Sequence, residues 1–563
     1  MGLSGIQIVL LFIVSCIVGM GSVLDSFQTH RPLIACTLVG IILGDVKTGV
    51  MLGGTLEMIA LGWMNIGAAQ SPDSALASVI STILVIVGNQ SVSAGIAIAL
   101  PVAVAGQVLT VLARTVTIFF QHAADKYAED ANFKMIDICH ITALAVQALR
   151  VAVPCLLVSM VVSPTGVQSM LNMIPDVITT GLSVAGGFIV VVGYAMVLNM
   201  MGAKYLMPFF FLGFVIAAFT DFNLVAFGIM GIVFGLIYIQ LNPKFNMPKA
   251  VPAAAAPAGG ASMDAGLDDD LDDELLGKGR KQDMSEEIKN TENTLTKKDR
   301  VSMFLRSNFQ QASFNFERIH ALGFAFDMVP AIKRLYHTKK EQSEALKRHM
   351  TFFNVTPGCV GPVLGVTAAL EETKANGADI DEGTIGSIKI GLMGPLCGVG
   401  DPIFWGTLRP ITAAIGASMA LTGNILGPVL FFVLFNAVRL AALYFGLEFG
   451  YKKGLDLVKN LAGNMLQKVT ECASILGLFV MGALVSKWTT LNVPLVVSKV
   501  TANGKTTVTT VQNILDQLMP GLLGLVLTLV VCRLLKKNIS PILIIFILFA
   551  VGIIGYGLGI LGA

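Results

Sequence analysis

Long apolar runs without a charged residue restrict the fold of this chain more than any other feature. Three of them are Val79–Val87, Gly521–Val531 and Ile542–Ile553. With their flanks they are long enough to cross a hydrocarbon core of about 30 Å. Apolar residues make up 54% of the sequence and charged residues only 13%, which leaves too little polar surface for a soluble domain of this length. We predict an all-α polytopic membrane protein.

A polar segment divides the chain into two membrane halves. Residues 250–300 contain an Ala/Pro/Gly stretch, an acidic cluster at Asp268–Glu274 and the basic and polar stretch Lys278–Arg300. This composition cannot bury a core and is typical of a flexible linker. The predicted domains are a membrane domain at 1–245, a flexible linker at 246–300, and a second domain at 301–563 that opens with an amphipathic cytoplasmic region.

Met284 marks a second way to divide the chain. It begins Met-Ser-Glu-Glu, which resembles a translation start. Residues 1–283 and 284–563 would then be two polypeptides joined end to end. A linker with an incidental methionine is the alternative.

Hydropathy predicts membrane segments in both halves, several of them broken or re-entrant because glycine and proline interrupt them. The predicted segments lie near residues 4–22, 33–62, 75–119, 139–162, 181–202, 205–240, 353–372, 385–421, 425–448, 470–487, 515–532 and 540–562. The first segment contains Ile6–Met20, which lacks a basic flank, so we interpret it as a membrane helix rather than a cleaved signal.

The placement of lysine and arginine predicts the orientation. Residues 284–350 are rich in basic side chains, and so is the short loop Arg533–Lys537, which places both in the cytoplasm. By alternation, residues 488–515 are extracytoplasmic. Asn503-Gly504 lies between β-branched runs in this loop, which is a strong signal for a two-residue hairpin turn. We predict a small extracytoplasmic β-hairpin.

The sequence lacks the motifs of several function classes. None of the eight cysteines belongs to a C-x-x-C pair, so we predict no disulfide and no metal site. The sequence contains no P-loop motif and no H-E-x-x-H motif. No basic run is interleaved with aromatic residues in the manner of single-strand binders. We therefore expect no cofactor and no nucleic-acid partner.

The first cluster of candidate functional residues interrupts an apolar stretch at 53–73. Ionisable groups at membrane depth are costly and mark functional sites, and broken helices occur at that depth where they line a cavity. The polar and special residues of this stretch are Gly53, Gly54, Glu57, Trp63, Asn65, Gly67, Gln70, Ser71 and Asp73.

A comparable stretch in the second half covers residues 391–410 and contains Asp401, Trp405, Thr407 and Arg409. Paired interruptions in two halves point to the binding site of a transporter. The structural alternative is close helix packing by glycine with a salt bridge between Asp401 and Arg409. A third polar group, at Asp25–Pro32, lies between two predicted spans. A role as a connecting loop is at least as plausible for it as a role in a binding site.

Carboxylates and amides in these stretches suit a sugar ligand. A hexose offers adjacent hydroxyls that donate to Glu or Asp and pair with Asn or Gln. Trp63 or Trp405 can stack on a pyranose ring, although a packing role is the commoner one for an aromatic residue in a membrane protein.

Long strings then identify a family resemblance over nearly the whole chain. The stretch HRPLIACTLVGIILGDVKTGVMLGGTLEMIALGWMNIGAA resembles subunit IIC of the mannose family of the phosphotransferase system, as do FQHAADK and LNMIPDV. The second half resembles subunit IID through SFNFERIHALGFAFDMVPAIKRLY, GLMGPLCGVGDPIFWGTLRP and QKVTECASILGLFVMGALVSKW. The family normally has IIC and IID as separate chains, so the junction is a departure that agrees with a start at Met284.

The resemblance implies a multi-pass complex of the bacterial cytoplasmic membrane. Such a complex moves mannose, glucose and related amino sugars and presents them to a phosphorylated IIAB subunit. It implies a trimer of IIC–IID pairs and a receptor role for bacteriocins, for which we expect the loop 488–515 to be the docking surface. Neither half would carry the phosphohistidine, so the histidines are not candidate catalytic residues.

Within that expectation, Glu57 and Asp73 are the candidate catalytic carboxylates, and the sequence does not separate them. Asn65, Gln70, Ser71, Gly67, Trp63, Asp401 and Thr407 are the candidate substrate-binding residues. Two other functions stay open at this point. A passive sugar channel would also line its path with broken helices and carboxylates, and a docking receptor would place its function in the external hairpin.

Overall fold

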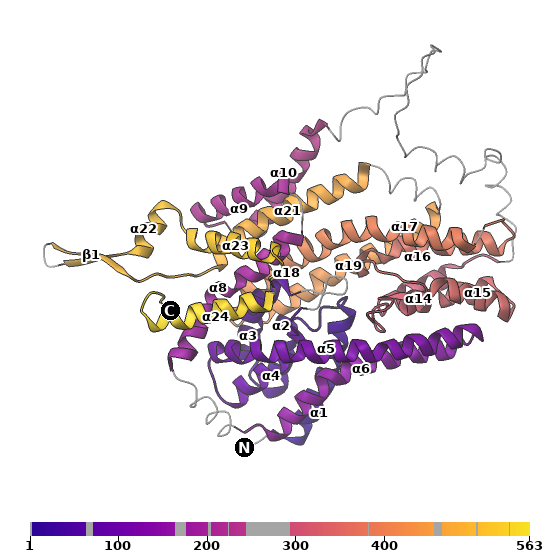
Figure 1. The fold of residues 1–563 in the computed structure, drawn as a ribbon, viewed down its shortest axis with the longest axis horizontal. Coiled ribbons are helices and arrows are strands. Elements are labelled where there is room, and N and C mark those ends of the chain that lie inside the picture. Colours follow the sequence, from indigo (N-terminus) through magenta and orange to yellow (C-terminus); the bar gives the residue numbers. More distant parts are fainter. Residues whose placement is uncertain are drawn as a thin grey trace, which may run out of the picture.

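The computed structural model shows a helical membrane protein, as the apolar runs predict (Figure 1). It describes residues 3–63, 71–163, 176–200, 204–222, 224–243, 293–380, 382–454, 464–502, 505–539 and 541–562. The predicted linker therefore lies largely outside the described residues. Figure 1 shows helices α14 (Ala321–Leu335) and α15 (Lys339–His349) at one end of the long axis and a β-hairpin at the other.

The first half is a bundle of helices separated by short polar breaks. Its elements are α1 (Gly5–Leu24), α2 (Pro32–Leu43), α3 (Val46–Ile59), η1 (Ala60–Gly62), α4 (Ser74–Val87), α5 (Val92–Glu129), α6 (Phe133–Val161), α8 (Asp176–Met200), η2 (Lys204–Leu206), α9 (Met207–Phe219) and α10 (Leu224–Leu241). The predicted break at 53–73 is confirmed, since α3 passes through η1 into an extended Trp63 before α4 begins.

Local capping explains where these helices stop and start. Gly44 ends α2 with a φ of +84°, and Asp45 caps α3 by accepting from the Thr48 N–H at 3.0 Å. The membrane segment predicted over 75–119 is occupied by two helices, α4 and α5. Asn89 has a φ of +49°, and Ser91 caps α5 by accepting from the Ala94 N–H at 3.3 Å. The chain thus turns at 88–91 and starts a new helix.

Four helices in the described part of the chain are long and apolar enough to cross a membrane: α1, α5, α6 and α19 (Leu426–Lys453). A fifth candidate is the pair α22 (Val511–Leu518) and α23 (Leu522–Lys536), which is bent by 82°. The 38 residues of α5 reach about 57 Å, nearly twice the hydrocarbon thickness of about 30 Å. One end of α5 therefore projects beyond the membrane, toward α15.

The second half combines amphipathic helices with membrane segments. Its elements are α13 (Lys297–Ser307), α14, α15, η4 (Pro357–Cys359), α16 (Val360–Ala375), α17 (Glu382–Gly400), η5 (Asp401–Leu408), α18 (Arg409–Ala420), α19, α21 (Asn464–Trp488), β1 (Val496–Ala502), β2 (Lys505–Thr510), α22, α23 and α24 (Pro541–Gly557).

The interruption predicted at 391–410 is a change of helix type rather than a gap. Helix α17 continues into the π-helical segment η5, which continues into α18. Pro402 and Pro410 each lack an N–H, and a π-helical turn lets the chain pass such positions without leaving the helix. Such turns are frequent at functional sites.

Close helix packing joins the two halves. Helix α21 of the second half contacts both α9 and α10, and α24 and α23 contact α8. At the α9–α21 crossing, a Cβ at Gly213 would collide with the carbonyl of Phe479, and one at Gly482 with that of Phe210. Phe210, Phe214 and Phe479 are fully buried there. The halves therefore share one apolar core.

A second apolar core lies beneath helices α13–α16, at the end of the molecule where α14 and α15 lie. Ala124 of α5 and Ile136 of α6 are buried against Met303, Leu322 and Phe324. Ion pairs join the same elements, with Arg306 to Asp137 at 2.8 Å and Arg318 to Asp125 at 2.9 Å. The projecting ends of α5 and α6 thus hold the amphipathic region in place.

The predicted β-hairpin is confirmed as a two-stranded sheet. Strands β1 and β2 pair antiparallel, with Lys499 opposite Val508 and Ala502 opposite Lys505. The predicted turn residues Asn503-Gly504 lie outside the described residues. The loop 488–515 is not all hairpin, because α22 begins at Val511 with Thr510 as its cap. The side of the membrane on which it lies stays a prediction, and Figure 1 places it at the end opposite α15.

Candidate functional site

The breaks between α1 and α2 and between η1 and α4 meet at a small polar pocket between the helices. The residues that line this polar pocket are Ser22, Asp25, His30, Trp63, Ser71, Pro72, Asp73, Ser74 and Thr110. Three of them, Trp63, Ser71 and Asp73, are candidate site residues from the sequence.

Asp73 is fixed by both of its carboxylate oxygens. Oδ1 caps α4 by accepting from the N–H of Ala75 at 2.9 Å and of Leu76 at 3.3 Å. Oδ2 forms an ion pair with Arg150 of α6 and accepts from the Thr110 hydroxyl at 3.3 Å. Asp73 can therefore orient a ligand, but its lone pairs are largely committed to the protein.

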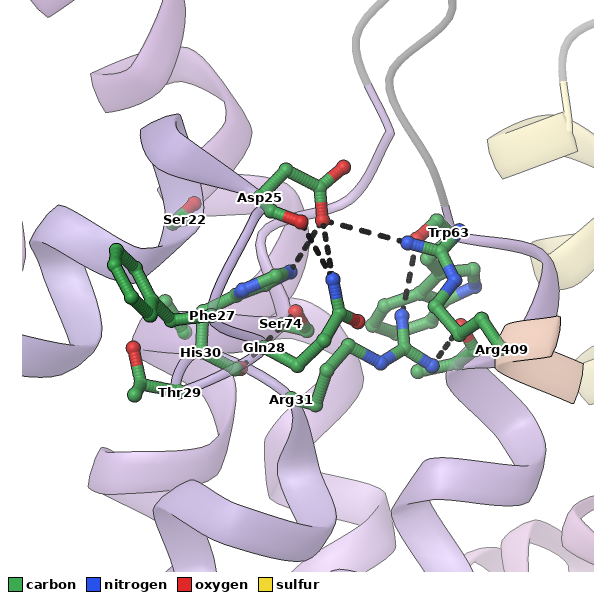
Figure 2. A network of polar contacts seen from close by, with 12 residues as sticks. Ser22, Asp25, Phe27, Gln28, Thr29, His30, Arg31, Trp63, Ser74 and Arg409 are labelled. Carbon is green, nitrogen blue, oxygen red and sulfur yellow. Dashed lines mark hydrogen bonds and ion pairs between the residues drawn. The ribbon is translucent and has the colours of Figure 1, made fainter. Parts of the chain in front are cut away.

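Asp25 is the second carboxylate of the polar pocket, at the end of α1. Its φ of +46° is unusual for a residue with a side chain, and such backbone strain concentrates at functional sites. Figure 2 shows three groups converging on Oδ1: Gln28 Nε2 at 3.2 Å, His30 Nε2 at 3.4 Å and Arg409 Nη1 at 3.4 Å. No described residue forms a hydrogen bond with Oδ2, so this oxygen stays available to a ligand.

Glu57 lies behind the polar pocket and does not line it. Its side chain is fully buried. Oε1 accepts from Arg31 Nε at 2.8 Å and Nη2 at 2.5 Å, and Oε2 accepts from the Leu33 N–H at 3.2 Å. Arg31 Nη1 also donates to the Trp63 carbonyl at 3.2 Å. This geometry gives Glu57 a positioning role, and its catalytic role stays a prediction.

The second polar stretch contributes to a neighbouring cavity of about 50 Å³, the inner pocket. Asp401 and Trp405 line it, together with Asp25, Arg114, His320 and Asn354. The Thr356 hydroxyl donates to Asp401 Oδ1 at 2.6 Å. Among the described residues Arg409 forms its ion pair with Asp25, so the alternative of a salt bridge to Asp401 is wrong.

Of the remaining candidates, the structure describes only Thr407. Thr407 is buried in η5 and lines neither. Asn65, Gly67 and Gln70 lie in 64–70, outside the described residues. Thr110 and Arg150 are not among the predicted site residues, although Arg150 is a charge within an apolar span, which is itself a signal of function. Asp25 and His30 belong to the third polar group, for which a loop role and a site role are both open.

Comparison with known proteins identifies the origin of both halves. Residues 5–237 match the family described as PTS system sorbose-specific IIC component. Residues 294–561 match the PTS system mannose/fructose/sorbose family IID component. A sorbose-specific EIID component of Klebsiella pneumoniae is 66% identical over 268 residues, which are 47% of this chain and 98% of that protein. The chain belongs to the mannose/fructose/sorbose family of the phosphotransferase system.

The first half has equally similar family members. A sorbose-specific EIIC component of Klebsiella pneumoniae is 70% identical over 245 residues, covering 44% of this chain and 92% of that protein. A mannose-specific EIIC component of Escherichia coli K12 is 65% identical over 246 residues, with the same two shares. The solved mannose transporter ManYZ in complex with microcin E492 matches with 59% identity and a TM-score of 0.29, over 48% of this chain and 100% of that one.

These matches settle the class of the protein. It carries a IIC component followed by a IID component of a sugar phosphotransferase system, and it is an integral protein of the cytoplasmic membrane. The two family matches leave residues 238–293 between them.

Proposed function

We propose that the polar pocket binds a hexose and presents one of its hydroxyls for phosphorylation. The observation that carries this proposal is the pairing of Asp25 and Asp73 in a pocket between apolar helices of a sugar phosphotransferase component. Two carboxylates and the hydroxyls of Ser71, Ser74 and Thr110 offer the acceptors that neighbouring sugar hydroxyls need.

Asp25 is the best placed base. Proton transfer requires an acceptor oxygen within hydrogen-bond reach of the hydroxyl. Asp25 Oδ2 is the carboxylate oxygen without a hydrogen bond from the described residues, whereas both oxygens of Asp73 are engaged. Asp73 would then orient the sugar. Trp63 lines the same pocket with its indole largely buried, where it can pack on the pyranose face.

The phosphoryl donor would be a phosphohistidine on a cytoplasmic IIAB partner. In the proposed transfer the sugar hydroxyl oxygen forms a bond to phosphorus while the phosphorus–nitrogen bond breaks and the imidazole leaves. The hydroxyl proton passes to Asp25. Positioning provides most of the rate in such reactions, which suits a site whose residues are held by helix caps and ion pairs.

Sorbose is a substrate to test beside mannose and glucose. Relatives described as sorbose-specific match both halves, and the sorbose EIIC component is 70% identical where the mannose one is 65% identical. The test is uptake of labelled mannose, glucose and sorbose into cells that contain the chain with its IIAB partner, alongside direct binding to purified protein. Absence of uptake and binding for all three would overturn the proposed function.

The same experiment separates group translocation from a passive channel. Uptake that requires IIAB and yields phosphorylated sugar supports the proposal. Uptake that persists without IIAB would favour the channel.

We also propose that the hairpin docks external peptides such as bacteriocins. Val496, Val497 and Val508 are each at least 43% exposed. A two-stranded sheet also leaves an unpaired edge to which an extended peptide can add by backbone pairing. Deletion of 496–510 should abolish peptide binding and spare sugar uptake. Binding that survives the deletion would contradict this role.

A further inference from the structure

The inner pocket lies between the two halves and adjoins the polar pocket. Val23, Asp25 and Arg114 of the first half line it together with Gln311, His320 and Asp401 of the second. Asp25 lines both pockets, so this side chain stands between the two.

Helix α5 shows which of the two pockets lies nearer the predicted cytoplasmic end. Thr110 lines the polar pocket and Arg114 lines the inner pocket. Residues four apart lie on the same helix face, about 6 Å apart along the axis. The next turns of α5 contact the amphipathic region, where the Thr117 hydroxyl donates to the Phe314 carbonyl at 2.6 Å. The inner pocket therefore lies one turn nearer the predicted cytoplasmic end.

Arg114 differs from the other buried arginines of the site. Arg31, Arg150 and Arg409 each form an ion pair with a carboxylate. Arg114 is 2% exposed, and its Nε and Nη1 have no hydrogen-bond partner among the described residues. Its guanidinium lies 4.3 Å from the centre of the Phe314 ring. A buried guanidinium whose N–H groups lack acceptors is costly, so Arg114 is suited to an anionic ligand.

We infer that Arg114 binds the phosphate group of the sugar phosphate in the inner pocket. This inference rests on the proposed function of the polar pocket. A guanidinium offers a planar pair of N–H groups that matches two phosphate oxygens. A sugar in the polar pocket that extends past Asp25 would bring its phosphorylated end to Arg114.

The carboxylates of the inner pocket set the strength of this binding. Asp25 is engaged by Arg409, His30 and Gln28, and Asp401 accepts from Thr356. The charge of Asp401, and that of Asp25 once it has released the sugar proton, oppose a phosphate that Arg114 attracts. The pocket is thus suited to hold a product briefly and to release it toward the cytoplasm.

Binding of mannose and mannose 6-phosphate to the purified full chain in nanodiscs tests the inference. The measured quantity is the ratio of the mannose 6-phosphate Kd to the mannose Kd. We expect Arg114→Gln to raise this ratio at least about tenfold, the loss expected for a charge-assisted hydrogen bond. Arg114→Lys should raise it less, because an ammonium keeps the charge without the fork. Arg439→Gln, a change of a buried arginine that lines neither pocket, should leave it unchanged.

The outcomes separate the two proposals. If the wild-type protein binds mannose but not mannose 6-phosphate, the role of Arg114 fails and the hexose site stands. If it binds neither ligand, the inference about Arg114 fails, and the proposed function then depends on the uptake and binding of glucose and sorbose. A ratio unchanged in Arg114→Gln overturns the inference. Should that variant not fold, an unchanged ratio in Arg114→Lys does the same.

Discussion

Arg409 of the IID part reaches Asp25 of the IIC part, with Nη1 lying 3.4 Å from Oδ1 across 384 positions of sequence. Arg409 is fully buried and also lies 4.6 Å from the centre of the Trp405 ring. Asp25 belongs to the polar pocket of the first part. The IID part therefore provides the positive charge that pairs with a carboxylate of the IIC part's pocket.

Asp25→Asn should destabilise the protein, because it leaves Arg409 buried without a charge partner. Loss of one member of a buried pair costs about 3–5 kcal/mol. The change should also abolish sugar phosphorylation if Asp25 is the base. Thermal unfolding in detergent and phosphorylation per folded protein measure the two effects separately. A folded variant that still phosphorylates sugar would remove Asp25 from the mechanism.

Asp73→Asn should weaken hexose binding while α4 stays intact. Asparagine caps a helix as well as aspartate does, so the substitution removes the charge rather than the cap. It also leaves Arg150 buried without its ion pair, so affinity is measured per folded molecule. We expect up to about a 100-fold loss of affinity, the upper range for a hydrogen bond to a charged group. The matched control is Ser91→Ala, which removes the exposed cap of α5 away from both pockets. An Asp73→Asn protein with normal affinity would contradict the assignment.

Glu57→Gln should lose uptake mainly through loss of stability. If Glu57 is catalytic, the variant should reach the membrane and lose phosphorylation-coupled uptake. In this variant Arg31 would lose its ion pair. Arg31 would then no longer be held in place to donate to the Trp63 carbonyl. Melting temperature and hexose affinity per folded molecule test this. A normally stable variant that binds hexose without phosphorylating it would instead make Glu57 catalytic.

The two halves should assemble when the chain is cut near residue 283, because their contact is a shared apolar core. Co-expressed halves should co-purify and restore uptake. Gly213→Ala should impair assembly, since a Cβ there meets the Phe479 carbonyl and overpacking costs about 1–3 kcal/mol. Gly228→Ala is the control, because nothing lies within 4 Å of its Cβ position. Well-expressed halves that stay apart would show that the linker is needed.

The hairpin should be accessible from outside the cell. A cysteine at Lys499 of β1 should react with a membrane-impermeant thiol reagent on intact cells. A cysteine at Lys340 of α15 should react only after the membrane is opened. Both positions are exposed, and the native cysteines are buried or half-buried. The reverse labelling pattern would invert the topology and remove the docking proposal.

The sequence alone determined the membrane class, the two-part organisation, the hairpin and the family. These properties depend on local composition and on strings of adjacent residues, such as the apolar runs and the Thr-rich strands around Asn503-Gly504. It also located one real break, at 53–73, because glycine and a run of polar residues interrupt an apolar stretch there.

The tertiary structure decided which polar groups meet. Asp73 contacts Arg150 and Thr110 on other helices. Asp25 forms an ion pair with Arg409 in the other half, and Glu57 forms one with Arg31. A buried charge is tolerated only beside a partner, and the position of that partner depends on how distant helices pack. No local pattern records this, so the role of each carboxylate and the unpaired state of Arg114 came only from the fold.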